Sequence, residues 1–261
     1  QLAHQLIRQE VHDLSLFDQY KDINFFNSTN FEVVKNVVMI VKKAIESGYD
    51  QNDIQVLAPI YQGVAGINAL NLALQEIFNP KNHQEEYRIG QKVYREGDKI
   101  LQLKNRPDDI YNGDIGVLVE INRKDGFEYL EDTLIVDYDG NLVEYTSKDF
   151  MTFTLAYCMS IHKAQGNEFK IVIMPVLNDY YIMLKRNLIY TGLTRAKQAL
   201  FILGNPQAFL YGIKNISDSK RKTTLVSKIN QNKNVETYEE SSYNQELKQN
   251  ITDFLNDDET V

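Results

Sequence analysis

The sequence predicts an α/β chain that is interrupted by a small antiparallel β-barrel. Strand-like and helix-like runs alternate in residues 1–95 and again in 151–231, which is typical of a parallel sheet covered by helices. Residues 96–150 instead hold short strand-like runs separated by Asn-Gly and Asp-Gly pairs, as in a compact barrel. Residues 232–261 contain 2 basic and 8 acidic residues and predict a flexible tail.

The first α/β part is expected to contain a strand between two helices. Asn30 can cap a helix over 31–47, whose apolar residues follow helical spacing. An apolar run over 54–59 predicts the strand, and a second helical pattern covers 65–78. Residues 1–27 predict no particular element.

The barrel segment is expected to contain four strands. In each of its turn pairs the second residue is glycine, which takes the positive φ that tight turns require. These pairs are Asn112-Gly113, Asp125-Gly126 and Asp139-Gly140. The strands are expected over 99–103, 115–122, 133–138 and 142–146.

The α/β pattern returns after residue 150. Strands are expected over 153–160, 170–177 and 199–204, and the second of these is nearly all apolar, as a buried parallel strand should be. A helix is expected over 180–196, and another begins at Pro206.

Composition and charge narrow the class of protein. The chain has 261 residues, 43% of them hydrophobic, so a packed core can form and a wholly disordered chain is excluded. One cysteine, Cys158, excludes a disulfide framework, and the four scattered histidines do not have zinc-site spacing. No apolar run approaches the length of a membrane span. Because the chain starts at Gln1, we expect a fragment or a processed product.

The net charge at first argues against nucleic acid as a ligand. It is −8, whereas a domain held on nucleic acid by its overall charge is normally basic. However, residues 232–261 account for −6 of this charge, which leaves −2 for the rest of the chain. The charge balance therefore does not exclude a DNA-binding face.

The densest group of polar side chains lies in 160–169, with the sequence Ser-Ile-His-Lys-Ala-Gln-Gly-Asn-Glu-Phe, between two expected strands. Ligands of α/β sheets bind at the carboxyl ends of strands, which makes this segment a candidate site. Gly166 allows a phosphate or sugar to approach the backbone closely. A polar connection with a glycine turn explains the same residues equally well.

A second candidate segment, 190–197, ends the expected helix with the sequence Tyr-Thr-Gly-Leu-Thr-Arg-Ala-Lys. Arg195 could bind a phosphate through two parallel hydrogen bonds. Alternatively, Arg195 and Lys197 only interact with the negative end of the helix dipole.

Taken in order, these two segments resemble motifs V and VI of superfamily 1 DNA helicases. That pattern is Ser/Thr-x-His-x-x-Gln-Gly-x-x-Phe followed by Tyr-x-x-x-Thr-Arg-Ala. The resemblance extends over about residues 1–225 and is closest to the RecD-type helicases, which include the alpha subunit of exodeoxyribonuclease V. Further similar segments are Ile54–Pro59, Ala65–Ile67, Leu70-Asn71, Leu74-Gln75, Gly97–Ile100 and Tyr111–Gly116.

The resemblance implies the fold and the nucleotide-binding residues. The fold is a RecA-like parallel sheet with helices on both faces, plus an inserted small antiparallel barrel of the Src-homology-3-like type. Gly166 and Glu168 are implied to lie against the nucleotide, with Glu168 towards the ribose, and Gln165 to couple the nucleotide and DNA sites. Arg195 is implied to be the arginine finger that reaches the γ-phosphate and stabilises the charge of the transition state.

The resemblance also implies the DNA-binding residues. Ser160 and His162 would contact the DNA backbone without reading its sequence. Asn112 and nearby basic residues could form a DNA-facing edge of the barrel, although its Asn-Gly pair needs only a turn to explain it. The basic residues are Lys99, Lys104 and Arg106. Tyr111 and Tyr138 could stack on bases, although in a chain with 16 tyrosines packing is the more common use of any one of them.

The chain contains no P-loop, because none of its 13 glycines is followed by lysine. Its one Asp-Glu pair, Asp258-Glu259, lies in the expected tail rather than after a buried strand. In the implied family the P-loop and the Walker B acid belong to the first RecA-like domain. The chain is therefore expected to be the C-terminal half of a helicase, which hydrolyses no ATP alone.

The implied cofactor of the full-length protein is ATP with Mg²⁺. The implied partners are single-stranded DNA, the missing N-terminal RecA-like domain and other subunits of an exodeoxyribonuclease V-type complex, with no membrane. Movement from 5′ to 3′ and a cytoplasmic location also follow from the resemblance. Two alternatives stay open: a non-catalytic nucleic-acid or protein-binding module built around the barrel, and the helicase module of a relaxase.

Overall fold

The computed structural model describes residues 2–8, 10–11, 13–107, 109–124, 126–127 and 129–216. The expected acidic tail, 232–261, lies outside the described residues.

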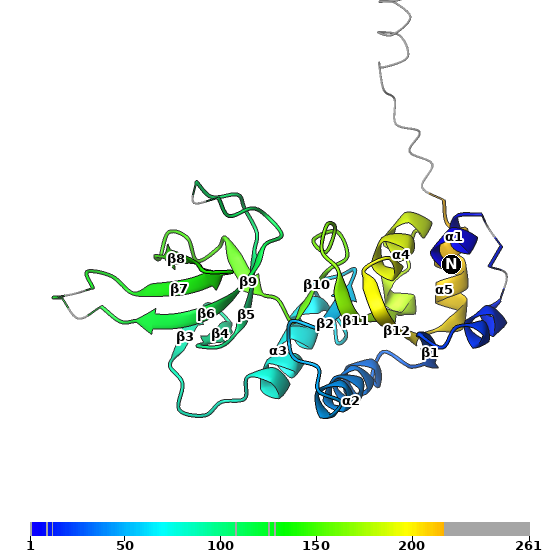
Figure 1. Cartoon of the computed structure of the whole chain (residues 1–261), viewed down its shortest axis with the longest axis horizontal. Helices are drawn as coiled ribbons and strands as arrows, with labels where there is room; N and C mark the ends of the chain where they lie inside the picture. The colour runs from blue at the N-terminus through cyan, green and yellow to red at the C-terminus, as the bar shows by residue number, and fades with distance from the viewer. Residues whose placement is uncertain are drawn as a thin grey trace, which may run out of the picture. The chain divides into compact units, whose positions relative to one another are not determined.

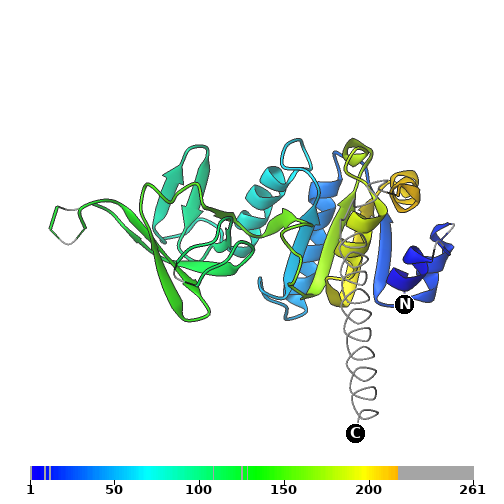
Figure 2. The same cartoon turned by 90° about the horizontal axis from the view of Figure 1, so that it is seen from above.

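A parallel sheet of five strands forms the α/β part of the chain, in the order β1-β12-β11-β2-β10 (Figure 1). The strands are β1 (Ile23–Asn27), β2 (Ile54–Ala58), β10 (Cys158–Ser160), β11 (Phe169–Val176) and β12 (Ala196–Gly204). Figure 2 shows these strands side by side. β2 is buried along its whole length, because a parallel sheet of this kind is covered on both faces.

Helices cover the two faces of this sheet (Figure 1). The helices α2 (Val33–Glu46) and α3 (Ile67–Phe78) pack together on one face. The helices α4 (Arg186–Leu193) and α5 (Pro206–Lys214) pack together on the other. Two short helices precede the sheet, α1 (Leu2–Ile7) and the 3-10 helix η1 (Leu14–Gln19). The expected parallel sheet with helices on both faces is confirmed.

An antiparallel sheet forms the inserted part, in the order β8-β7-β6-β5-β9. Its strands are β5 (Lys99–Gln102), β6 (Ile115–Asn122), β7 (Thr133–Tyr138), β8 (Asn141–Tyr145) and β9 (Phe153–Leu155). The expected turn at Asp139-Gly140 joins β7 to β8, with φ of 52° and 91°. The hairpin of β3 (Glu86–Ile89) and β4 (Lys92–Arg95) was not expected from the sequence.

The expected single strand over 153–160 is wrong, because the chain passes there from one sheet to the other. β9 pairs with β5 of the antiparallel sheet, and β10 pairs with β2 of the parallel sheet. Between them the Ala156 N–H donates to the Lys99 carbonyl (2.8 Å). The Tyr157 hydroxyl donates to the Asp98 carboxylate (3.0 Å). These bonds turn a continuous apolar run into two strands.

Two expected helices differ in extent from the observed ones. The helix over 180–196 is α4 alone, preceded by the short 3-10 helix η2 (Asn178–Tyr180). Asn30 does not cap α2, because the carboxylate of Glu32 instead accepts the hydroxyl (2.8 Å) and the N–H (3.2 Å) of Thr29. Residues 1–27, for which no element was expected, include the edge strand β1.

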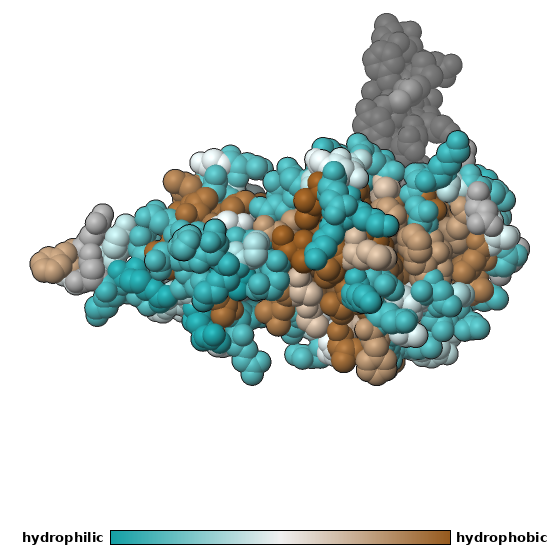
Figure 3. Space-filling model, turned by 90° about the horizontal axis from the view of Figure 1, so that it is seen from below, coloured by the Kyte–Doolittle hydropathy of each residue, from teal (hydrophilic) through white to brown (hydrophobic). Residues whose placement is uncertain are grey.

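The edge strand β1 has apolar side chains on both faces of the sheet. Phe25 packs against Phe209 of α5, with ring centroids 5.9 Å apart. The next residue, Phe26, points to the other face and stacks on Phe201. On that face a groove runs between α2 and the strands β1 and β12, and apolar side chains are exposed there (Figure 3). The parallel sheet thus keeps an apolar surface open beside α2.

Candidate nucleotide and DNA site

The motif segment 160–169 connects β10 to β11. Ser160 is the last residue of β10, and it is buried. Ile161 and Ala164 anchor the segment in the core, because their side chains are buried. The motif side chains His162, Gln165 and Glu168 are exposed, and so is Gly166. The segment is therefore fixed through apolar residues and presents polar ones to solvent.

Gly166 has the conformation that the sequence predicts for a close backbone approach. Its φ is 92°, which side chains disfavour, and no atom lies within 4 Å of the position that a Cβ would occupy. The backbone at this glycine is thus open to a ligand.

The strand register separates the expected site residues into two groups. Ser160 pairs with Ala58, at the carboxyl end of β2. At the other end, Phe169 pairs with Ala196, where β11 and β12 begin. Because Ile171 pairs with Ile54, the two levels are about six residues apart, or roughly 20 Å at the usual strand rise. Ser160 and the residues beside Phe169 therefore do not meet at one point.

Arg195 lies at the amino end of β12 and folds back onto the end of α4. Its Nε donates to the Thr191 carbonyl (3.1 Å), and one terminal nitrogen donates to the Thr194 hydroxyl (3.0 Å). The other terminal nitrogen donates to the carbonyl of Asn167 (3.0 Å). The contacts with α4 are those of a cation at a helix C-terminus, as the simpler interpretation of Arg195 predicts. These bonds use three of the five guanidinium N–H groups and fix its orientation.

Glu168 lies at the same end of the sheet and forms an ion pair with Lys197 (3.1 Å). Both side chains are more than half exposed, at 53% and 56%. Such an exposed pair adds little stability. Glu168 can therefore exchange this partner for a ligand at small cost.

The loop between β5 and β6 contacts the motif segment. The Lys163 ammonium donates to the Asn112 side-chain carbonyl and to the Leu103 carbonyl (3.4 Å). Partial burial lowers the pKa of Lys163. The Asn167 side-chain amide donates to the Gly113 carbonyl (3.3 Å). Asn112 is thus placed beside the motif segment, but its amide oxygen already has a partner.

Three of the expected DNA-facing residues of the barrel, Lys99, Arg106 and Tyr138, are instead engaged in contacts within the protein. Lys99 is buried, so the expectation that it faces DNA is wrong. Arg106 lies over the ring of Tyr145 (4.7 Å) and pairs with Asp149 (3.2 Å). The ring of Tyr138 is buried and cannot stack on bases. Lys104, Tyr111 and Asn112 are the members of this set that are exposed.

Sequence reasoning assigned no role to Asn167 or Lys163, although both lie inside the motif segment. No local sequence pattern identifies these contacts, because the partners, Gly113 and Asn112, are 54 and 51 residues away in sequence.

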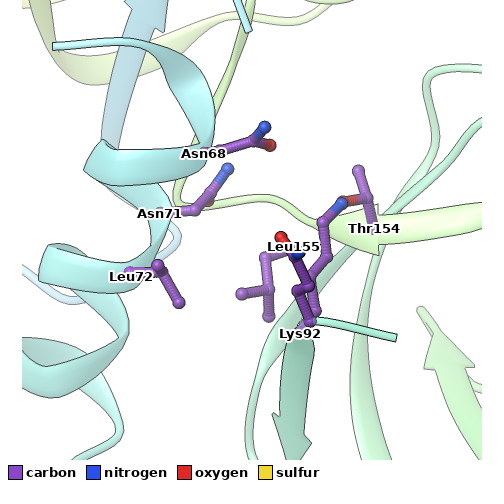
Figure 4. Close-up of a pocket in the computed structure, with 7 residues that line it drawn as sticks. Asn68, Asn71, Leu72, Lys92, Thr154 and Leu155 are labelled. Atoms are coloured by element: carbon purple, nitrogen blue, oxygen red, sulfur yellow. The ribbon is translucent and has the colours of Figure 1, made fainter. Parts of the chain in front are cut away.

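A separate hollow of about 140 Å³ lies between α3 and the antiparallel strands (Figure 4). Figure 4 shows Lys92 and Thr154 directed towards each other, and the Lys92 ammonium donates to the Thr154 hydroxyl (2.8 Å). The Asn71 amide is engaged with the backbone of Cys158. None of the expected site residues lines this hollow. Its main polar groups already have protein partners.

Within the described part of the chain, no group of three or more His, Cys, Asp or Glu residues could hold a metal ion. In the same residues, no helix has both the length and the apolar character to cross a membrane.

Two family models match the chain. The SH3 domain of ATP-dependent RecD-like DNA helicases matches residues 70–138, and the C-terminal domain of UvrD-like helicases matches 155–203. The ATP-dependent RecD2 DNA helicase of Deinococcus radiodurans is 34% identical over 177 residues, which cover 67% of this chain and 23% of that protein. The RecBCD enzyme subunit RecD of Buchnera aphidicola subsp. Acyrthosiphon pisum is 28% identical over 214 residues, covering 75% and 34%.

The chain spans a quarter to a third of the length of these two relatives. A solved Pif1 helicase from Bacteroides, in complex with ADP-AlF3 and ssDNA, has a TM-score of 0.40 and 13% identity, over 81% of this chain and 55% of that one. The resemblance inferred from the motifs is confirmed by the family models and the two relatives. The chain is related to the RecD-like helicases of superfamily 1, and what it shares with them includes their SH3 domain and a helicase C-terminal domain.

Proposed function

We propose that this chain is the C-terminal motor part of an ATP-dependent DNA helicase. One observation carries the proposal: the register places Ser160 roughly 20 Å along the strand direction from Phe169 and Ala196, which flank Glu168 and Arg195. The two groups of site residues therefore start from opposite ends of the sheet. Two ligands, a DNA strand and a nucleotide, account for both, and the motor of a helicase needs both.

The DNA strand would lie along the carboxyl end of β10. The exposed His162 and the terminal residue Ser160 would hold phosphates without reading the sequence. Asn112 would join them from the barrel loop, beside Lys163. A strand held in this way binds equally well whatever its bases.

The nucleotide would lie at the opposite end of the sheet. The residues there fit half of a site for ATP with Mg²⁺: an open glycine backbone at Gly166, a carboxylate at Glu168 and a guanidinium at Arg195. The phosphate cradle of a P-loop is missing from this sequence. When bound, ATP would supply the free energy of hydrolysis for movement along DNA.

Arg195 would stabilise negative charge on the terminal phosphate. Its three side-chain hydrogen bonds leave two of the five guanidinium N–H groups for this purpose, which is the number that a bidentate phosphate contact uses. Glu168 would release Lys197 and accept a ribose hydroxyl. Gln165, between the two ends, would transmit the state of one ligand to the other.

We infer that the chain acts with an N-terminal RecA-like domain and hydrolyses no ATP without it. Movement from 5′ to 3′, a cytoplasmic location and assembly with subunits of an exodeoxyribonuclease V-type complex complete the proposal. The alternative of a non-catalytic binding module predicts that the complete protein also lacks ATPase activity.

The test is Arg195→Ala in the complete protein, measured as Mg²⁺-dependent ATPase in the presence of single-stranded DNA. We expect turnover to fall by about 10³-fold or more, while DNA affinity stays within about twofold. Arg186→Ala is the matched control, because Arg186 lies at the other end of α4 and donates to the Ile213 carbonyl (2.7 Å). Turnover of Arg195→Ala near the wild-type value would contradict the proposed finger.

A further inference from the structure

Asn167 lies between the barrel and Arg195 and bonds to both. Its side-chain amide donates to the Gly113 carbonyl of the β5–β6 loop (3.3 Å). Its backbone carbonyl accepts from the Arg195 guanidinium (3.0 Å). One residue thus connects the inserted barrel to the proposed arginine finger.

On the barrel side, the loop residue that accepts from Asn167 is itself fixed by hydrogen bonds. The Gly113 N–H donates to the Gln102 carbonyl (3.0 Å), which ties the loop to β5. Gly113 has a φ of 108°, and a Cβ there would meet the Lys163 carbonyl at 3.5 Å. Lys163 bonds to the neighbouring Asn112. Two adjacent loop residues therefore contact two residues of the motif segment.

The arginine end is equally specific. Two of the three side-chain hydrogen bonds of Arg195 go to Thr191 and Thr194, at the C-terminal end of α4. The third, to Asn167, is the one that comes from another segment of the chain. Asn167 is fixed in turn by its own N–H, which donates to the buried Ala164 (3.2 Å). A shift of Asn167 therefore changes the direction in which the guanidinium points.

We propose that Asn167 is a positioning residue that couples the barrel loop 103–114 to Arg195. A single-stranded DNA backbone bound beside Asn112 would hold this loop, and the Gly113–Asn167 bond would transmit that constraint to the guanidinium. The inference rests on the proposed function and deepens it, because it assigns the barrel a part in the stimulation of ATP hydrolysis by DNA.

The experiment uses the complete protein and measures ATPase turnover with and without an oligo-dT strand. The readout is the ratio of the two turnover numbers, with KM for ATP measured separately. Asn167→Ala removes the side-chain donor but keeps the backbone carbonyl that Arg195 uses. We expect this ratio to fall about fivefold, which is the effect of one net hydrogen bond, with KM changed less than twofold.

Two substitutions separate positioning from packing. Asn167→Asp keeps the shape of the side chain but removes the donor, so it should lower the ratio at least as much as Asn167→Ala. Asn167→Gln keeps an amide donor and should recover part of the ratio. Asn52→Ala, at an exposed asparagine in a turn, is the matched control and should leave the ratio unchanged. Because each ratio comes from one sample, a smaller folded fraction cancels.

The outcomes distinguish this inference from the proposed function. Wild-type ratios in Asn167→Ala and Asn167→Asp, together with loss of turnover in Arg195→Ala, would overturn the inference and leave the proposed function intact. An equal loss in Asn167→Ala and Asn167→Gln, with a wild-type ratio in Asn167→Asp, would also overturn it. A complete wild-type protein without DNA-stimulated ATPase activity would overturn the proposed function, and this inference with it.

Discussion

The two five-stranded sheets differ in where their polar side chains lie. In the parallel sheet, the apolar strand β11 is buried and the motif side chains His162 and Glu168 lie exposed in a connection. In the antiparallel sheet, polar groups are buried and bonded to each other. There the Tyr145 hydroxyl donates to Gln102 (2.8 Å) and lies 2.9 Å from the Tyr138 hydroxyl. The motif side chains beside the parallel sheet are thus open to solvent, whereas the buried tyrosines of the antiparallel sheet stabilise its fold.

The clearest example of buried polar groups that bond to each other lies where the chain passes between the two five-stranded sheets. Asp98 is fully buried, and its carboxylate accepts from Gln75 (2.6 Å), Asn79 (2.8 Å) and Tyr157 (3.0 Å), and from the N–H of Arg95 (2.8 Å). Burial raises the pKa of this carboxyl. Its partners come from α3, from β4 and from the crossing between β9 and β10, so one side chain joins the two sheets.

The largest effect is therefore expected from Asp98→Ala. It leaves the side-chain donors of Gln75 and Asn79 buried without their acceptor, and should lower the free energy of unfolding by about 3–5 kcal/mol. Urea denaturation of the chain measures this change. Asp22→Ala, at an exposed carboxylate, should change it by less than about 0.5 kcal/mol. Equal effects of the two substitutions would show that Asp98 does not join the sheets.

A smaller effect, dependent on pH, is expected from the neighbouring Lys99. Its ammonium donates to the Gln51 carbonyl (2.7 Å) and to the Gln55 side chain (3.1 Å), and burial lowers its pKa from 10.5 to about 7. Between these two values the unfolded chain binds more protons than the folded one. The free energy of unfolding therefore rises with pH across this window.

The test compares the wild type with Lys99→Met at pH 7.5 and at pH 9.5. The wild type should gain about 2 kcal/mol from this group over that interval, and the variant should lack this gain. Each protein is compared with itself at the two pH values. The cost of the hydrogen bonds that Lys99→Met removes is the same at both values and therefore cancels. A rise in the variant as steep as in the wild type would place the titrating group elsewhere.

The smallest expected effect tests whether DNA binds to the motif segment 160–169 or to the barrel. Ser160→Ala with His162→Ala should weaken binding of single-stranded DNA about fivefold, to the same extent for oligo-dT and for mixed sequences. Arg106→Ala in the barrel should leave affinity unchanged, because Arg106 contacts Tyr145 and Asp149. Fluorescence anisotropy measures both. A larger loss of affinity in Arg106→Ala would place the DNA-binding surface on the barrel. A loss of affinity for only one DNA sequence would contradict binding through the DNA backbone.

Sequence patterns predicted the helices and strands whose apolar residues recur regularly over a long segment. The helices α2 and α3 and the strand β11 were found close to their observed ends. The break between β9 and β10 could not be predicted, because 153–160 is mostly apolar without a Gly, Pro, Asn or Asp, and only pairing with two different partners divides it. The late start of α4 at Arg186 was missed for a similar reason: the contacts of Asn215 with Leu184 and Arg186 come from the far end of α5.

For the site, the sequence predicted residue types and their order but not their contacts. The motif pattern made Arg195 a candidate site residue, which stays a prediction, and the simpler interpretation through the helix dipole agrees with its contacts at the end of α4. The link through Asn167 depends on a loop that is 54 residues earlier in the chain, which no local pattern contains. The burial of Lys99 was missed because a lysine next to an aspartate usually indicates a solvated surface.

Asn71 of α3 has a consequence for how the protein behaves at high concentration. Its side-chain amide exchanges two hydrogen bonds with the backbone of Cys158, from its nitrogen to the carbonyl (2.7 Å) and from the Cys158 N–H to its oxygen (2.8 Å). β10 is an edge strand, and the amide occupies this residue's backbone groups as a sixth strand would. A second molecule therefore cannot extend the sheet at Cys158, so a side chain of α3 protects the protein against aggregation at this edge.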